Sequence, residues 1–302
     1  MDIAVSGSHG LIASSLIPVL RSAGHNVRRL VRPDSGASGS DPSDIAWDPD
    51  AGVLDPDALE GVGAVINLAG AGIGDEKWSP ERKKIVIESR TRSTTLLAET
   101  LAERGDATVV FLSGSAIGFY GNRPDEVCTE ESASGAGFLP EVCRAWEEAA
   151  APAVDAGLRV AFLRTGIVLD PSGGALKPLL LPFRLGLGGK AGTGRQGFSW
   201  VHVEDEVGGI VKILDDASLS GPVNLTAPNP LTYGEFAHAL GAALHRPTLL
   251  PTPTFAISAK LGKEAAREMV LEGVKVLPAK LTAAGYRFHY PEIGPALADL
   301  LG

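Results

Sequence analysis

The sequence predicts an α/β fold built on a doubly wound parallel sheet, followed by a smaller, interleaved C-terminal α/β domain. Short aliphatic runs of strand length alternate with longer runs of helical pattern, which is typical of βαβ units. The 302 residues are 44% hydrophobic, which is enough for a large buried core. The 37 Gly and 21 Pro have no tripeptide period, so a collagen-like chain is excluded, and the abundant aliphatic residues argue against disorder.

The first strand, expected at residues 3–5, runs into a glycine turn that opens a helix expected at 11–23. Gly7 permits the tight turn, Gly10 lets the backbone approach a pyrophosphate at the helix N-terminus, and Ala13 lets the helix pack on the strand. Turn glycines without a ligand are common, but these follow a strand and begin a helix. The loop therefore predicts a Rossmann-like dinucleotide site. Its expected cofactor contacts are Gly7, Ser8, His9, Gly10, Leu11 and Ile12.

The second strand, expected at 27–31, bears on which dinucleotide binds. An NAD site carries an acid about 20 residues after the glycine turn, where it binds the ribose 2′-hydroxyl. Here the strand contains Arg28 and Arg29 and leads into Arg32, and the first acid is Asp34. We expect Arg32, with Arg28 or Arg29 as further candidates, to bind a 2′-phosphate; solvated arginines at a strand end are the alternative. The prediction is NADP(H), with NAD(H) less favoured.

Three further strands and two helices complete the expected first domain. The strands are expected at 64–68, 109–112 and 160–163, and the helices at 79–104 and 140–156. Ser79 and Pro80 open the longer helix well, as an N-cap and a first-turn proline. Parallel strands bind ligands at their carboxyl ends, so the site is expected at that edge of the sheet.

The pattern changes after residue 163. A stretch rich in Gly, Pro and Leu is followed by further expected elements, namely strands at 200–203 and from 222 and helices at 204–215 and 232–244, before a terminal helical region. We therefore expect a dinucleotide-binding domain over 1–165 and also 200–225. The substrate-binding C-terminal domain is expected over 166–199 and 226–302.

Charge and composition limit the partners. Lys and Arg total 27 against 36 Asp and Glu, a formal net charge of −9, which argues against a general nucleic-acid binder. The chain has no run of about 18 apolar residues, and its start lacks the basic region of a signal peptide. Two cysteines are too few for a disulfide framework, and no residue spacing predicts a metal site. We expect a cytoplasmic protein that binds small molecules, without nucleic-acid or membrane partners.

A set of motifs extends along nearly the whole chain. They are NLAGAG at 67–72, SRTRST at 89–94, FLSGSAIGFYG at 111–121, LRTGIVL at 163–169, GRQGFSWVHVED at 194–205, NLTAPNP at 224–230, HRP at 245–247 and GYRFHYP at 285–291. Together they resemble the extended short-chain dehydrogenase/reductases. The last three are specific to an atypical branch labelled NAD-dependent epimerase/dehydratase family protein, with its own type of C-terminal domain.

This resemblance implies that loops at the strand ends bind the cofactor and that hydride is transferred at the nicotinamide. Further cofactor contacts are then Leu68, Ala69, Gly70, Ala71, Arg90, Ser113, Arg164 and Gly166. Arg90 takes the place of an asparagine that is usual in the family, and Ser115 is the nearest equivalent of the active-site serine. The superfamily often forms dimers through the helices expected at 79–104 and 140–156, so a homodimer is possible.

One departure from the family pattern concerns the acid/base pair. The superfamily uses a tyrosine and a lysine four residues later, because the ammonium lowers the phenol pKa so that phenolate can take a proton from an alcohol. Leu139 and Cys143 stand at these positions, and neither can do this chemistry. Tyr120 with Ser115 is a candidate catalytic pair, but a structural role for Tyr120 as an aromatic residue at the strand end is the favoured interpretation. We expect an oxidoreductase or epimerase; a non-catalytic NADP(H)-responsive binding or regulatory protein is the alternative.

The substrate side is expected near the glycine-rich stretch before residue 200. Its basic residues, in an otherwise acidic chain, favour a small polar or anionic substrate, and dispersed charges on a surface loop are the alternative. Arg195, Gln196 and Trp200 are the expected substrate contacts, although Trp200 could equally belong to the core.

Overall fold

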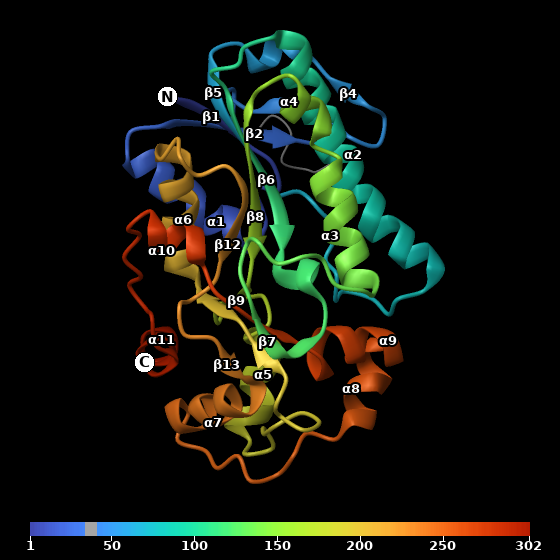
Figure 1. Cartoon of the computed structure of the whole chain (residues 1–302), viewed down its shortest axis with the longest axis vertical. Helices are drawn as coiled ribbons and strands as arrows, with labels where there is room; N and C mark the ends of the chain where they lie inside the picture. Colours follow the sequence, from blue (N-terminus) through green and yellow to red (C-terminus); the bar gives the residue numbers. More distant parts are fainter. Residues whose placement is uncertain (34–40) are drawn as a thin grey trace.

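The computed structural model describes residues 1–33 and 41–302, and Asp34 lies outside them. Its central sheet has the strand order β12-β8-β6-β5-β1-β2-β3-β4 (Figure 1). All of its strand pairs are parallel except β3–β4. The strands are β1 (Asp2–Val5), β2 (Asn26–Val31), β3 (Ile45–Asp48), β4 (Val53–Leu54), β5 (Val62–Asn67), β6 (Val110–Ala116), β8 (Arg159–Thr165) and β12 (Gly221–Leu225). Five of them, β1, β2, β5, β6 and β8, correspond to the strands expected in the first domain.

Helices cover both faces of this sheet, as Figure 1 shows. On one face lie α1 (Leu11–Ser22) and α6 (Val203–Asp215), and on the other α2 (Pro80–Arg104), α3 (Phe138–Glu148) and α4 (Ala151–Asp155). Because alternate residues of a strand point to opposite faces, Ile3 and Val5 join the core under α1 and α6, while Ala4 joins the core under α2 and α4. The predicted α/β fold of Rossmann type is confirmed.

One expected helix differs from the structure. The long helix starts as expected, with Ser79 accepting a hydrogen bond from the Arg82 amide at 3.1 Å. The helix expected at 140–156 is instead two helices, α3 and α4, with Pro152 in the first turn of α4. Proline has no amide hydrogen and clashes with the preceding turn, so it starts a helix more readily than it continues one.

The C-terminal part packs around a core of its own. Phe198 stacks on Phe236 with ring centroids 4.1 Å apart, and Trp200 is fully buried beside them. Thr232 and Glu235 form a capping box at the start of α7, close to the predicted helix start. The elements not yet given are η1 (Pro56–Leu59), η2 (Ile117–Tyr120), β7 (Arg123–Cys128), β9 (Ile167–Leu169), α5 (Lys177–Arg184), β10 (Gly197–Phe198), β11 (Trp200–His202), β13 (Leu231–Thr232), α7 (Tyr233–Ala243), α8 (Thr254–Leu261), α9 (Lys263–Ala266), η3 (Arg267–Leu271), β14 (Val274–Val276), α10 (Ala279–Ala283) and α11 (Ile293–Leu301).

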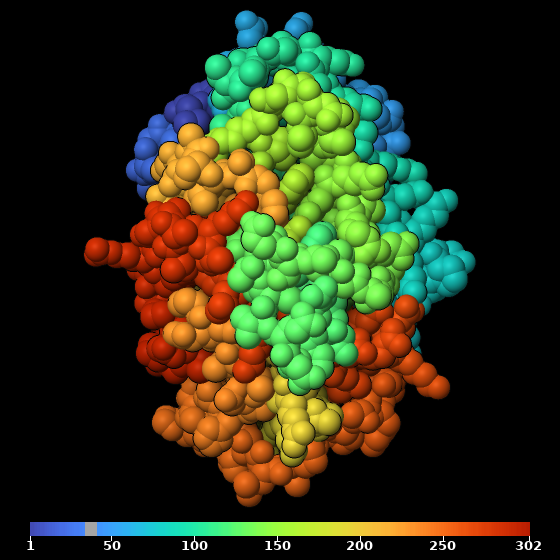
Figure 2. Space-filling view, viewed as in Figure 1, coloured from blue at the N-terminus to red at the C-terminus, as the bar shows by residue number. Residues whose placement is uncertain are grey.

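Short pairings join the two parts of the chain. β7 pairs in parallel with β14, so the residues after η2 lie against the C-terminal residues, green against red and orange in Figure 2. The Glu268 carboxylate also accepts a hydrogen bond from the Leu139 amide at 3.0 Å, which stabilises the start of α3. The domain boundaries expected from the sequence stay a prediction. Within the described ranges, no helix is both long and apolar enough to cross a membrane.

Candidate functional site

The glycine turn after β1 leaves a helix N-terminus open to a ligand. Gly7 has a φ of +63°, and a Cβ there would lie 2.6 Å from the Leu68 carbonyl oxygen, so only glycine fits without a shift of the backbone. Gly10 is the N-cap of α1 and donates its amide hydrogen to the Gly7 carbonyl oxygen at 2.8 Å. Gly10 has no side chain with which to cap α1, so the first amide groups of this helix can bind an anion.

The loop after β5, residues 68–72, lies against this turn. Buried polar side chains hydrogen-bond to its first residues. Ser6 Oγ donates to Asn67 Oδ1 at 2.6 Å and accepts from the Leu68 amide at 3.0 Å. Asn67 in turn donates from Nδ2 to Thr94 Oγ1 at 2.9 Å. Because every partner in this chain of hydrogen bonds is satisfied, the loop has one well-defined position.

Helix α2 holds the other end of the same loop. Ser89 Oγ accepts from the Ala71 amide and Arg90 donates to the Ala71 carbonyl oxygen, both at 3.0 Å. The Arg90 guanidinium also lies 4.9 Å from the centre of the Trp146 ring, and burial lowers the pKa of Arg90. Arg90, expected as a cofactor contact, therefore supports the loop in this structure.

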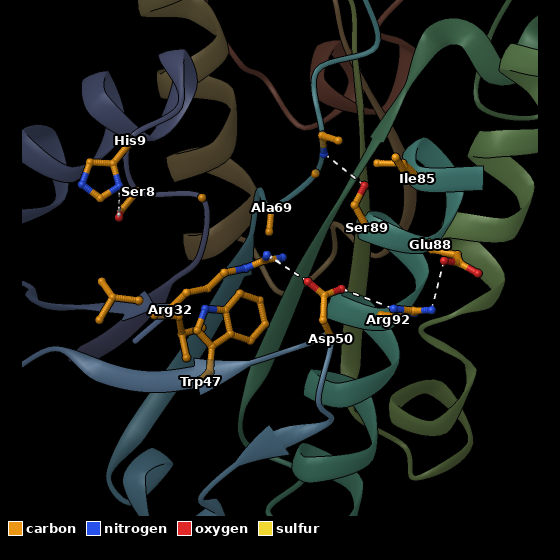
Figure 3. A pocket seen from close by; sticks show the side chains of 15 residues that line it. Ser8, His9, Arg32, Trp47, Asp50, Ala69, Ile85, Glu88, Ser89 and Arg92 are labelled. Carbon is orange, nitrogen blue, oxygen red and sulfur yellow. Dashed lines mark hydrogen bonds and ion pairs between the residues drawn. The ribbon is translucent and has the colours of Figure 1, made fainter. Parts of the chain in front are cut away.

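A pocket of about 530 Å³ lies between the glycine turn, the loop after β5, α2 and the end of β2 (Figure 3). It is lined by Gly7, Ser8, His9, Leu30, Val31, Arg32, Trp47, Asp50, Ala69, Gly70, Ala71, Ile85, Glu88, Ser89 and Arg92. The structure thus brings together seven of the predicted cofactor residues: Gly7, Ser8, His9, Arg32, Ala69, Gly70 and Ala71. The other predicted contacts, Gly10, Leu11, Ile12, Leu68, Arg90, Ser113, Arg164 and Gly166, do not line this pocket.

Only one of the three arginines around β2 lines the pocket. Arg29 pairs with Asp44 through contacts of 2.8 and 2.6 Å, which raises its pKa, and Arg28 donates to the Ser43 carbonyl oxygen at 3.3 Å. Arg32 lies at the mouth of the pocket, where its Nη1 is 3.0 Å from Asp50 Oδ2. Of the candidates for a 2′-phosphate on this strand, the geometry favours Arg32.

The carboxyl end of β6 carries a second polar network. Ser115 Oγ donates to Glu147 Oε1 at 2.7 Å, and the same carboxylate receives two hydrogen bonds from Arg164, at 2.8 and 2.9 Å. Arg164 also donates to the Tyr120 hydroxyl oxygen at 3.0 Å, and that hydroxyl donates to Asn224 Oδ1 at 2.6 Å. A two-pronged arginine–carboxylate pair this well shielded fixes the position of both side chains.

Two of the predicted site residues are buried in this network. Tyr120, expected as a catalytic partner of Ser115, has no exposed surface, and burial raises the pKa of its phenol. Arg164, expected at the cofactor, is 3% exposed and its donors are engaged by Glu147 and Tyr120. Both residues serve the packing between β6, β8 and β12 in this conformation. Ser115 keeps 4% of its surface exposed.

Of the three predicted substrate residues, two are buried and one is exposed. Gln196 donates from its amide to the Ala191 and Val270 carbonyl oxygens at 3.1 and 2.8 Å, and Trp200 is fully buried in the C-terminal core, so neither offers a surface to a ligand here. Arg195 is exposed and stays a candidate.

Two further residues expected at the cofactor, Ser113 and Gly166, lie in tightly packed surroundings. Ser113 is buried and its hydroxyl has no partner among the residues that the structure describes. Gly166 packs tightly, since a Cβ there would lie 2.8 Å from the Ser199 carbonyl oxygen.

Comparisons with known proteins show the family to which the chain belongs. Residues 3–140 match the model of the NAD dependent epimerase/dehydratase family, and residues 252–300 match a domain of unknown function, DUF1731. The chain is 43% identical to Epimerase family protein Mb2239 of Mycobacterium bovis over 295 residues, covering 98% of this chain and 96% of the relative. It is 34% identical to human epimerase family protein SDR39U1 over 304 residues, covering 100% of both. The chain belongs to the epimerase family.

A solved structure extends the likeness to three dimensions. The crystal structure of human epimerase family protein SDR39U1 (isoform 2) with NADPH superposes with a TM-score of 0.88 at 32% identity, covering 100% of this chain and 99% of that one. The resemblance expected from the motifs is confirmed. The C-terminal motif at 285–291 falls within the second matched domain.

This epimerase family protein lacks a reactive pair on α3. Leu139, Cys143 and Glu147 follow at four-residue intervals, which puts them on one face of the helix. Cys143 Sγ donates weakly to the Ala116 carbonyl oxygen at 3.5 Å, and burial, with Glu147 nearby, raises its pKa to about 12. A Cβ on Gly118 would lie 3.2 Å from Leu139 Cβ, so η2 packs closely on this face. Leu139 and Cys143 therefore contribute packing at the positions where the superfamily has its acid/base pair.

Sequence reasoning missed several pocket residues of this epimerase family protein. Trp47 and Asp50 come from β3 and the turn after it, while Ile85, Glu88 and Arg92 come from α2. The run Ile45-Ala46-Trp47 is strand-like but short, and nothing in the sequence brings Arg92 near Asp50. No group of three metal-binding side chains occurs in the described part of the chain.

Proposed function

We propose that this epimerase family protein binds NADP(H) and catalyses hydride transfer to or from a small polar or anionic substrate, as an oxidoreductase or an epimerase. The observation that carries the proposal is the pocket of about 530 Å³, with an uncapped helix N-terminus behind the Gly7 turn on one side and Arg32 on another. A pyrophosphate needs the first feature and a 2′-phosphate needs a group like the second. The human relative solved with NADPH supports the choice of cofactor.

The residues fit this cofactor in distinct roles. The α1 amide groups would hold the pyrophosphate, Arg32 the 2′-phosphate, and the loop over 68–71 would line one wall. These residues would hold a cofactor whose nicotinamide, when bound, would supply or accept the hydride. Ser115 donates its hydroxyl proton to Glu147 at the carboxyl end of β6, and its oxygen would accept a hydrogen bond from a substrate hydroxyl. Arg195 is the residue we propose for a substrate anion.

A second candidate function is a non-catalytic protein that responds to NADP(H). It is favoured by Leu139 and Cys143 at the acid/base positions, since neither exchanges a proton with an alcohol near neutral pH. The cytoplasmic location and the homodimer stay predictions, and one Arabidopsis relative is named as chloroplastic.

Two measurements on the purified protein separate these functions. Calorimetry with NADPH reports binding, and the absorbance of reduced nicotinamide reports its oxidation with a panel of aldehydes, ketones and keto sugars. Tight binding with oxidation above background supports an oxidoreductase, and Ser115→Ala should then lower kcat more than it raises KM. Binding without turnover across the panel and without sugar epimerisation favours the second function. No binding of NADPH or NADH would refute both.

A further inference from the structure

We propose that two arginines, Arg32 and Arg92, bind the 2′-phosphate of NADP(H) together, and that Asp50 occupies the phosphate position when the cofactor is absent. This inference rests on the proposed binding of NADP(H). It adds a second phosphate contact, Arg92 on α2, and a carboxylate, Asp50, that changes the ratio of the NADPH and NADH affinities.

Three separate elements bring these charges to one side of the pocket. Arg32 follows β2, Asp50 lies in the turn after β3, and Arg92 extends from the fourth turn of α2 (Figure 3). Arg32 Nη1 lies 3.0 Å from Asp50 Oδ2, and Arg92 Nη1 lies 3.4 Å from Asp50 Oδ1. One carboxylate therefore bridges two guanidinium groups, one through each oxygen.

This bridge has the chemistry of a phosphate site. Guanidinium groups pair with carboxylates and phosphates through the same planar, two-pronged geometry. A phosphate monoester near pH 7 carries more charge than a carboxylate and has three terminal oxygens, so it binds two guanidiniums more strongly than Asp50 does. Glu88 contacts Arg92 Nη2 at 3.0 Å from the adjacent turn of α2 and keeps the side chain of Arg92 along the helix.

Exchange of Asp50 for phosphate needs little rearrangement. The side chains of Arg32, Asp50 and Arg92 are 48, 51 and 45% exposed, and ion pairs this exposed contribute little to stability. The backbone of the turn is anchored separately, because Asp48 Oδ1 accepts hydrogen bonds from the Asp50 and Ala51 amides at 3.0 and 3.1 Å. Rotation of the Asp50 side chain therefore exposes Arg32 Nη1 and Arg92 Nη1 to a phosphate without a shift of this turn.

Asp50 has a different effect on NADH. In an NAD site, an acid after the second strand accepts a hydrogen bond from the ribose 2′-hydroxyl. Asp50 comes from the turn after β3, but its carboxylate lies beside Arg32, which follows that second strand. Asp50 therefore competes with the 2′-phosphate of NADPH and can accept from the 2′-hydroxyl of NADH. Arg92 raises the preference for NADPH, and Asp50 limits it.

The test is the ratio of NADPH to NADH dissociation constants, measured by calorimetry on the full chain. Arg92→Gln should weaken NADPH by about ten- to a hundred-fold, the range for losing a hydrogen bond to a charged group, and NADH by less than about three-fold. Asp50→Asn should tighten NADPH and weaken NADH. Lys84→Gln is the matched control: it removes one positive charge from the same helix beside the same Glu88 (3.7 Å), and Lys84 does not line the pocket.

The outcomes separate this inference from the proposed function. If the wild-type protein binds neither nucleotide, the proposed function fails. If it binds NADPH but Arg92→Gln changes the ratio no more than Lys84→Gln does, the role of Arg92 is refuted. If Asp50→Asn weakens NADPH, Asp50 orients the arginines and the competition is refuted. Unchanged thermal midpoints without nucleotide show that the variants fold, and Arg92→Lys, which keeps the charge, should retain part of the preference.

Discussion

Glu147 holds a buried charge in place, and removing its carboxylate should cost the protein much of its stability. The Arg164 and Glu147 side chains are 4 and 13% exposed, and they share two hydrogen bonds. Glu147→Ala leaves the Arg164 guanidinium without a carboxylate in a site that water reaches poorly. Breaking one partner of a buried pair typically costs about 3–5 kcal/mol, and we expect a loss in that range.

The assay is thermal and urea denaturation followed by circular dichroism. A loss of about 3–5 kcal/mol corresponds to a fall in the thermal midpoint of about 5–8 °C for a chain of this size. Glu126→Ala is the control, because Glu126 forms an ion pair with Arg123 at a similar 2.9 Å but is 62% exposed. That pair should contribute less than about 1 kcal/mol.

A double variant makes the reasoning refutable. Replacing both charges, with Glu147→Leu and Arg164→Met, removes the unpaired charge and should cost less than Glu147→Ala alone. If Glu147→Ala costs no more than Glu126→Ala, or if the double variant costs the sum of its two single variants, burial of the charge does not govern stability here.

Three further predictions follow from single contacts. Gly7→Ala combines a left-handed φ of +63° with a Cβ 2.6 Å from the Leu68 carbonyl oxygen, so it should lower stability by at least about 1–2 kcal/mol and abolish nucleotide binding, measured by denaturation and calorimetry. Full burial raises the pKa of Glu206 from 4.5 to about 8, so the folded state binds the extra proton between these values. Stability should then fall by up to about 1.4 kcal/mol per unit as pH rises through that window and level off above it; Glu206→Gln should remove this slope, and an unchanged slope would contradict the assignment. Cys143, with its pKa raised to about 12, should resist iodoacetamide near pH 8 in the native protein and react after unfolding, as followed by mass spectrometry.

Local sequence patterns were sufficient for the glycine turn and the strands. Gly7 and Gly10 follow an aliphatic run and precede a helix, so both the turn and its ligand class depend on residues within about ten positions of each other. The short strands β3 and β14 escaped prediction, because neither is followed by a glycine turn that opens a helix, the signal that marked the similarly short β1. Pro152 could have indicated the break between α3 and α4, since it stands inside the expected helix.

By itself, the sequence determined the fold class, the glycine turn and the lack of a tyrosine–lysine pair at 139 and 143, and it predicted Arg32 as a phosphate contact, because each depends on residue type and local spacing. Only the tertiary structure decided which side chains are buried and which line the pocket. Tyr120 and Arg164 lie buried inside a network that joins η2, α3, β8 and β12, and neither lines the pocket. Asp50 and Arg92 are 42 positions apart and meet only because the turn after β3 packs against α2. The burial of a side chain and its approach to a distant charged residue follow from long-range packing, which no local sequence pattern encodes.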